Sequence, residues 1–200
     1  MPSIDYYFAT ISPFTYLAGT RLEEIAERHR AQVIYKPLDV VALFARTGGT
    51  PPGERHPNRQ EYRLQDLRRR AALQDLPINL KPAHFPTNGA PAAFAIIAAQ
   101  HAGGGDLGQL CHSLTRACWA EERNVAEDEV IKDCLTAAGF DPALADKGML
   151  AGAEEYARNL EDAVQAGAFG APFYITDTDE RFWGHDRLDD LDAVLSGRLG

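Results

Sequence analysis

The chain begins and ends with short apolar runs, and it carries helical periodicity in between. SIDYYFAT (3–10) and AQVIYKPL (31–38) are rich in aromatic and β-branched residues, which is typical of strands. Residues 14–30, which separate them, place Leu22 and Ile25 on one face of an amphipathic helix. The pattern therefore predicts a β-α-β unit at the N-terminal end.

A second pattern of this kind closes the chain. GAPFYITD (170–177) and ERFWGHD (180–186) each read as a short strand, and the turn between them is expected around Thr178-Asp179. The last segment, DRLDDLDAVLSG (186–197), has the spacing of an amphipathic helix. The C-terminal end is therefore predicted to be β-β-α.

The middle of the chain differs from both ends. Residues 40–57, VVALFARTGGTPPGERHP, are rich in Gly and Pro and are predicted to form a long binding loop. Residues 58–75 are strongly charged, and helical periodicity continues at about 89–102, 106–119, 125–138 and 151–166. These patterns predict an α/β, thioredoxin-like fold. Residues 1–40 and 167–200 would form the thioredoxin-like domain, and 41–166 would supply the loop and an inserted all-helical domain.

Composition narrows the possible partners. The 200 residues carry 20 basic and 29 acidic side chains, a net charge of −9, and the pI is about 5.1. Such a chain has no basic face for nucleic acid or anionic membrane. The first residues enter a strand at once without a charged and then apolar leader, and no later run approaches a membrane span. We therefore expect a cytoplasmic protein.

The cysteines and histidines do not indicate a metal site. Cys111, Cys118 and Cys134 all fall in predicted helices without ligand spacing, and they are expected to be buried thiols and not a disulfide. The six histidines are scattered along the chain. We expect no bound metal.

Ser12-Pro13 marks the start of the first helix and raises the main chemical question. Serine is a preferred N-cap and proline is favoured at the first helical position, so capping alone would explain this pair. Redox members of the thioredoxin fold carry Cys-x-x-Cys here, whereas this chain has Ser12-Pro13-Phe14-Thr15. A site that suits a thiolate but lacks a thiol must receive one from outside. Glutathione is the expected donor, with Ser12 hydrogen-bonded to its sulfur.

Several motifs carry a resemblance that spans nearly the whole chain. DYYFATISPFTYLA near the start, with GAFGAPFYI and RFWGHDRLDDL near the end, resembles the 2-hydroxychromene-2-carboxylate isomerases. That family is similar to kappa-class glutathione transferases and to DsbA-type oxidoreductases. YKPL, LFARTGGTPP and HFPTN match weaker family patterns between the two ends.

The resemblance implies a glutathione site at named positions. Ser12 would be the catalytic residue that contacts the sulfur, and Pro172 would be a cis-proline that leaves the backbone of Ala171 free to pair with the tripeptide. His185 and Asp186 would hold the γ-glutamyl end. Two alternatives stay open, because Pro172 could be a trans proline entering an edge strand and Asp186 could simply cap the last helix.

Other assignments concern the glycyl end of glutathione and the second substrate. Phe44 and Arg46 are expected near the glycyl end, while Lys36, Arg46 and Asn88 are expected near the second substrate. A basic group in an acidic protein would suit an anionic substrate, although Lys36 and Arg46 could equally be solvated charges.

The second-substrate region also departs from the family pattern. Ala9 stands where the family commonly has an acidic residue before the serine motif, and Ala45 stands where many isomerases have lysine. The glutathione site is thus expected to be intact and the second-substrate site altered.

The activity that the resemblance implies is a glutathione-dependent isomerisation in aromatic degradation. The substrate would be 2-hydroxychromene-2-carboxylate or a related aromatic enone carboxylate, and reversible conjugate addition of the thiolate would let a carbon–carbon double bond rotate. Glutathione would be regenerated each turn, and the family implies a homodimer. The alternatives are a kappa-like glutathione transferase and a non-catalytic thioredoxin-like module that binds a peptide or a partner protein.

Overall fold

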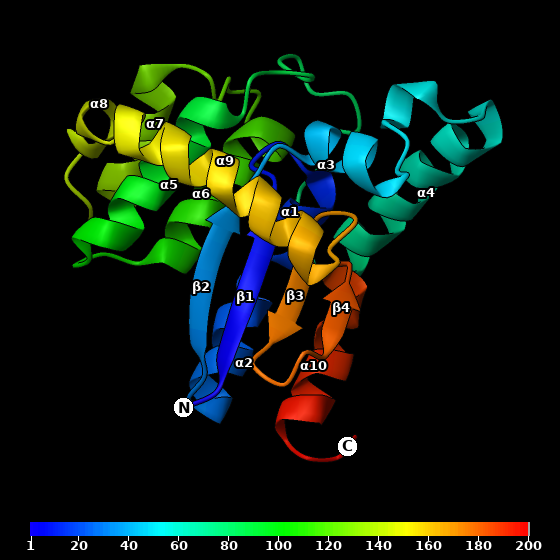
Figure 1. Cartoon of the computed structure of the whole chain (residues 1–200). Helices are drawn as coiled ribbons and strands as arrows, with labels where there is room; N and C mark the ends of the chain where they lie inside the picture. Colours follow the sequence, from blue (N-terminus) through cyan, green and yellow to red (C-terminus); the bar gives the residue numbers. More distant parts are fainter. Residues whose placement is uncertain (200) are drawn as a thin grey trace.

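A mixed four-stranded sheet forms the base of the protein in the computed structural model, which describes residues 1–199 (Figure 1). Its strands are β1 (Ser3–Phe8), β2 (Gln32–Pro37), β3 (Phe173–Thr176) and β4 (Arg181–Trp183), in the order β2-β1-β3-β4. β1 pairs with β2 in parallel, and the β1–β3 and β3–β4 pairs are antiparallel. The predicted β-α-β and β-β-α units thus share one sheet, with β1 and β3 at its centre.

Helices α1 (Pro13–Ala18) and α2 (Arg21–His29) connect β1 to β2, and η2 (His185–Arg187) with α10 (Leu188–Leu195) follows β4. All other helices lie between β2 and β3 in the sequence. They are α3 (Val40–Thr47), η1 (Pro52–Glu54), α4 (Pro57–Leu73), α5 (Ala90–Ala102), α6 (Leu107–Ala120), α7 (Asp128–Ala137), α8 (Leu144–Lys147) and α9 (Met149–Ala166). Among residues 1–199, no helix combines the length and apolar character needed to cross a membrane.

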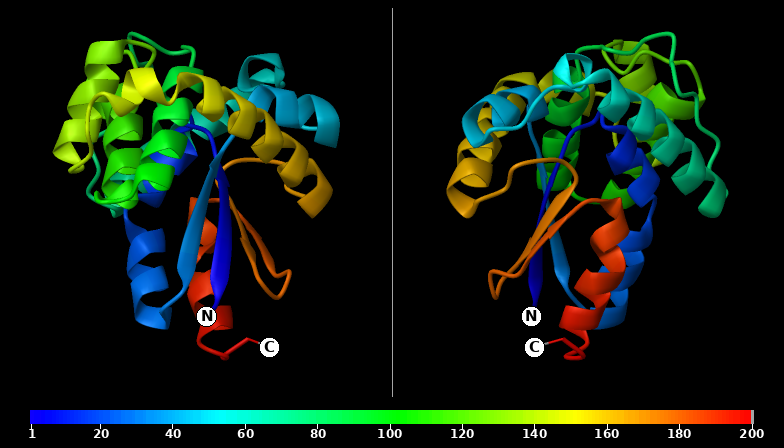
Figure 2. Two further views of the ribbon diagram at one scale, coloured as in Figure 1. Left: turned by 60° about the vertical axis from the view of Figure 1, so that its left-hand side comes forward. Right: turned by 90° about the vertical axis from the view of Figure 1, so that its right-hand side faces the viewer.

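Alternation along β1 divides the core between the two faces of the sheet. Ile4, Tyr6 and Phe8 point to the face covered by α2 and α10, where they join the larger core cluster. Tyr7 points to the other face and packs with Phe173 beneath α9. Figure 2 shows α2 and α10 side by side on one face of the sheet and α9 across the other.

The larger core continues from the sheet into the helices of 41–166. Tyr6 and Leu17 belong to the same cluster as Ile96 of α5 and Trp119 of α6, and all four are buried. The division into a thioredoxin-like domain and an inserted helical domain therefore stays a prediction, because one continuous core serves both.

Two predicted elements were wrong in detail. The single helix expected over 14–30 is broken between α1 and α2, where Gly19 has a φ of 59° and its N–H bonds to the Tyr16 carbonyl. The loop expected over 40–57 begins with α3, because the Asp39 carboxylate accepts from the N–H groups of Val41 and Ala42 and so caps a helix there. Only residues 48–51 and 55–56 of this segment lie outside helical structure.

Candidate active site

A large cavity lies where α1, α3, α4 and the loop before β3 come together, and its volume is about 680 Å³. Its wall is mostly apolar. The lining includes Phe14 of α1, Phe44 of α3, Phe85 and Trp183. A cavity of this size, with a few polar groups in an apolar wall, is typical of a small-molecule site.

Ser12 lies in this wall as the N-cap of α1. Its backbone is extended, and its Oγ accepts a 3.3 Å hydrogen bond from the Thr15 N–H. The Ser12 hydroxyl in turn donates, at 3.5 Å, to the carbonyl of Ala171. Ala171 also lines the cavity, and the Ala171–Pro172 bond is cis, as the resemblance implied.

His185 and Asp186 belong to η2 and line the same cavity. His185 is 3% exposed, its ring stacks on Phe14 with centroids 5.6 Å apart, and its Nε2 has no hydrogen-bond partner among residues 1–199. Burial lowers the pKa of His185, so the imidazole is neutral at pH 7. The imidazole therefore contributes a neutral ring to the cavity wall, while its Nε2 is itself buried.

Asp186 is charged and already paired. Its Oδ2 lies 2.9 Å from Arg187 and 3.9 Å from Arg70. Burial would raise the pKa of this carboxyl, but the hydrogen bond and the charge of Arg187 outweigh burial and lower it. The alternative that Asp186 caps the last helix is wrong, since Arg187 is the residue before α10 and no side chain of the described residues makes a capping hydrogen bond there.

Three residues expected at the second substrate do not line the cavity. Lys36 lies on β2 with its Nζ 3.3 Å from Asp5 and 3.2 Å from Asp162. Arg46 makes a double hydrogen bond with Glu161, at 2.7 and 3.2 Å.

Asn88 is the third of these residues. It accepts from the Ala90 N–H at the start of α5, outside the cavity wall. The structure thus brings together Ser12, Phe44, Ala171, His185 and Asp186, and it places Lys36, Arg46 and Asn88 elsewhere. Substrate binding by these three is not favoured by the geometry.

The cavity contains charged residues that the sequence patterns did not single out. Arg55, Arg63 and Asp66 all line it, the first from the segment before α4 and the other two from α4 itself. A signal was present for Arg63, because it lies four residues before Leu67 and eight before Ala71, the buried positions of α4. A charged residue on the buried stripe of a helix is a candidate for a ligand site.

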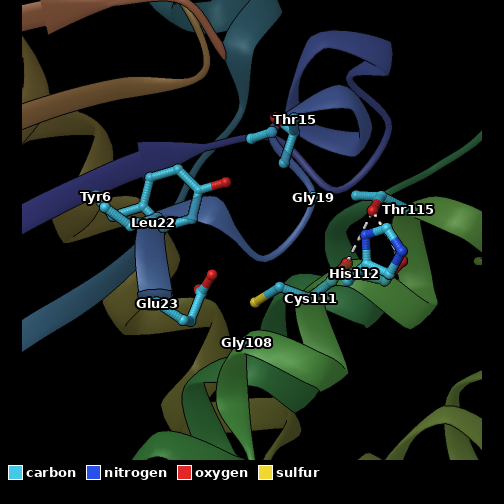
Figure 3. Close-up of a pocket in the computed structure, with 10 residues that line it drawn as sticks. Tyr6, Thr15, Gly19, Leu22, Glu23, Gly108, Cys111, His112 and Thr115 are labelled. Atoms are coloured by element: carbon cyan, nitrogen blue, oxygen red, sulfur yellow. Dashed lines mark hydrogen bonds between the residues drawn. The ribbon is translucent and has the colours of Figure 1, made fainter. Parts of the chain in front are cut away.

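A second, much smaller cavity lies behind α1 (Figure 3). Its volume of about 10 Å³ suffices for about one water molecule and excludes a substrate. In the part of the chain that the structure describes, three buried polar atoms at its wall have no hydrogen-bond partner, namely Thr15 Oγ1, Glu23 Oε2 and His112 Nδ1. Gly108 is required there, since a Cβ at this position would lie 2.5 Å from Cγ of Glu23.

Comparisons with known proteins agree with this architecture. The family model of the DsbA-like thioredoxin domain matches residues 3–196. The chain is 31% identical to the 2-hydroxychromene-2-carboxylate isomerase of Sphingobium xenophagum, over 96% of this chain and 97% of the relative. It is 24% identical to the glutathione S-transferase kappa 1 of Caenorhabditis elegans, over 94% and 88% of the two chains.

Solved structures give the same picture of the fold. A 2-hydroxychromene-2-carboxylate isomerase superposes with a TM-score of 0.78 at 24% identity, covering 98% of this chain and 95% of that one. The cytosolic disulfide reductase DsbM from Pseudomonas aeruginosa, solved with GSH, superposes with a TM-score of 0.71 at 18% identity and covers 98% of both chains. The predicted thioredoxin-like fold is confirmed. The chain belongs to the DsbA-like thioredoxin-domain family and, within it, to the group that holds the 2-hydroxychromene-2-carboxylate isomerases and a kappa-class glutathione transferase.

Proposed function

We propose that the protein is a glutathione-dependent isomerase of 2-hydroxychromene-2-carboxylate or a related aromatic enone carboxylate. The observation that carries the proposal is the position of Ser12 in the wall of a large apolar cavity, where this hydroxyl at the start of α1 faces Ala171, the residue before the cis-proline Pro172. The relative from Sphingobium xenophagum, 31% identical, supports the same reaction class. A cytoplasmic homodimer remains part of the proposal.

The residues around the cavity fit glutathione. The Ser12 hydroxyl suits the sulfur, because its oxygen accepts from Thr15 and its own proton can turn toward a ligand. Asp186 suits the γ-glutamyl ammonium, and the neutral ring of His185 lines the cavity beside Asp186. The DsbM structure with GSH comes from the same fold family.

When bound, glutathione supplies a thiolate whose reversible addition to a carbon–carbon double bond allows that bond to rotate. Ser12 holds the sulfur in its charged form by donating a hydrogen bond. Because α1 has only six residues, we assign this stabilisation chiefly to the hydroxyl and the first-turn N–H groups. Lowering a thiol pKa by one unit corresponds to about 1.4 kcal/mol. The apolar wall, which includes Phe14 and Phe44, offers few hydrogen-bonding groups to water near the reacting atoms.

The test is the stoichiometry of glutathione. Excess 2-hydroxychromene-2-carboxylate and limiting glutathione are followed together by ultraviolet absorbance and free-thiol titration. Many turnovers without loss of thiol support the isomerase. Loss of one thiol per molecule of a halonitrobenzene, with the chromene unchanged, would support a kappa-like transferase, which the relative from Caenorhabditis elegans makes the second candidate. Inactivity in both assays would favour the non-catalytic binding module.

A further inference from the structure

Two arginines in the cavity wall are not paired with a carboxylate among residues 1–199, and Asp66 of the same wall pairs with Arg69 and Arg70 instead. Arg55 and Arg63 both line the cavity, and within residues 1–199 neither forms a salt bridge. Burial and the neighbouring charge of Arg55 lower the pKa of Arg63, although arginine stays protonated at pH 7. Arg46, by contrast, is paired with Glu161 outside the cavity. A desolvated cation without a partner is a site that an anion would satisfy.

Aromatic rings hold the Arg63 guanidinium in place without neutralising it. Its Cζ lies 6.0 Å from the centre of the Phe14 ring and 5.9 Å from that of Trp119. Phe85, which also lines the cavity, packs on Trp119 with centroids 4.8 Å apart. The cation is thus set among flat apolar surfaces, and such surroundings suit an aromatic ring that carries an anionic group.

The position of Arg63 relates it to the reacting centre. Phe14 follows Ser12 by two residues in the first turn of α1, and both residues line the cavity, so the Phe14 ring connects the Arg63 cation to the helix end that we assign to the sulfur. Phe14 also stacks on His185, which belongs to the proposed γ-glutamyl end. Arg55 lies over Phe44 instead, with its Nε donating to the Thr50 carbonyl at 2.7 Å. Of the two arginines, Arg63 is therefore the one that lies over a ring of α1, the helix that Ser12 caps.

We propose that Arg63 binds the carboxylate of the second substrate and makes the site specific for planar aromatic acids, with Arg55 adding positive charge nearby. This inference rests on the proposed function, because it names the group that orients the substrate toward the thiolate. Arg63 would also supply the positive charge that the sequence pattern assigned to Lys36 and Arg46. Both of those residues are paired with carboxylates outside the cavity, Lys36 with Asp5 and Asp162 and Arg46 with Glu161. A guanidinium can hold a carboxylate through two parallel hydrogen bonds.

Calorimetry on the protein saturated with glutathione tests the proposal without a turnover assay. The probes are trans-cinnamate and its neutral analogue trans-cinnamamide. We expect the wild type to bind the acid more tightly than the amide, by about tenfold or more, because only the acid can form a hydrogen-bonded charge pair with the Arg63 guanidinium. Arg63→Met should abolish this preference, and Arg63→Lys, which keeps the charge but not the fork, should retain part of it. Arg68→Met is the matched control, an exposed arginine of the same helix, and should leave the preference unchanged.

Equal binding of the two probes by the wild type, or a preference that survives in Arg63→Met, would overturn the proposal. A second titration separates the substrate carboxylate from the glycyl carboxylate of glutathione. If Arg63→Met weakens the binding of glutathione but not that of γ-glutamylcysteine, Arg63 holds the glycyl end and the proposal is wrong. A wild type that prefers cinnamate yet leaves the chromene unchanged would count against the proposed isomerase and not against the carboxylate site.

Discussion

Ser12 and Ala171 are 159 residues apart in the sequence, and a 3.5 Å hydrogen bond from the Ser12 hydroxyl to the Ala171 carbonyl joins them. This bond is long for a hydroxyl donor, whereas the oxygen of the same hydroxyl accepts from the Thr15 N–H at 3.3 Å. A sulfur anion in the cavity would be a stronger acceptor for the hydroxyl proton than this distant carbonyl. The Ser12 hydroxyl, between the start of α1 and the loop before β3, can therefore donate its hydrogen bond to a ligand instead of to Ala171.

Replacing Ser12 by alanine should lower the isomerisation rate at pH 7. At high pH the rate of the variant should be a larger fraction of the wild-type rate. A hydrogen bond to a charged sulfur contributes about 1.5–3 kcal/mol, so we expect a loss of about tenfold to a hundredfold in kcat/KM at pH 7. The deficit should shrink as pH approaches the pKa of free glutathione, where the thiol ionises without help. The measurement is the pH profile of the initial rate of Ser12→Ala against wild type.

The control for this variant is the loss of a helix cap elsewhere. Asp106 caps α6 through a 2.9 Å bond from the Gln109 N–H, and Asp106 does not line the cavity. Asp106→Ala should cost about 1 kcal/mol of stability and leave the pH profile unchanged. A deficit in Ser12→Ala that is constant with pH would show that Ser12 positions the ligand and does not stabilise the thiolate.

Asp186→Asn should weaken glutathione binding while the protein stays folded. The variant removes the charge that we pair with the γ-glutamyl ammonium, and we expect a loss of about tenfold or more in affinity, measured by calorimetry. Asp190→Asn is the matched control, because Asp190 also pairs with Arg187, at 3.1 Å, but does not line the cavity. Equal affinities of Asp186→Asn and wild type would remove Asp186 from the binding site.

Local signals in the sequence were enough to predict the four strands and the start of the first helix. The β-branched and aromatic runs fixed all four strands to within a few residues, and Ser12-Pro13 located the start of α1 because a cap is written in adjacent residues. The pattern did not predict α3, because Gly and Pro in the second half of 40–57 are typical of a loop. The capping Asp39, one residue before this segment, is the local signal for the helix.

The sequence patterns could not predict ion pairs between residues that are far apart in the chain. Lys36 and Arg46 have the charge expected of a substrate anchor, but Glu161, which neutralises Arg46, lies 115 residues away. Arg63 lies in a segment with many charged residues, and its own sequence neighbours do not distinguish it. What sets it apart is its position over the rings of Phe14 and Trp119, which only the folded chain brings beside it. Net charge and spacing indicate which side chains could bind an anion, and tertiary packing decides which remain unpaired.

The protein should lack disulfide oxidoreductase activity, and its own thiols should be unreactive. Ser12 and Thr15 replace the redox pair, and Cys111, Cys118 and Cys134 are buried in α6 and α7. Burial raises the pKa of Cys118 and of Cys134 to about 11, so about one thiol in a thousand is ionised at pH 8. We expect no insulin reduction above background, and slow thiol titration that reaches three groups only after unfolding. Rapid native titration would show that one helix opens readily.

Glu23→Gln should stabilise the protein increasingly as pH rises. The carboxyl of Glu23 lies at the small cavity of Figure 3, where its Oε1 accepts from the Tyr35 hydroxyl at 2.7 Å and its Oε2 has no partner within residues 1–199. Burial raises the pKa of Glu23 above its ordinary value of 4.5, and the hydrogen bond from Tyr35 offsets only part of this. Between the unfolded and folded pKa values the folded state binds more protons, so the free energy of unfolding falls as pH rises through that window.

Glutamine cannot ionise, and its carbonyl oxygen can still accept from Tyr35, so Glu23→Gln escapes this loss. Denaturant unfolding at pH values from 4 to 8 should give a difference between variant and wild type that grows upward from about pH 4.5 and then levels off. Glu24→Gln removes an exposed carboxylate from the same turn of α2, and subtracting its pH dependence corrects for the change in net charge. A corrected difference that is flat with pH would mean that Glu23 ionises in the folded protein as readily as in the unfolded chain, and the prediction would be wrong.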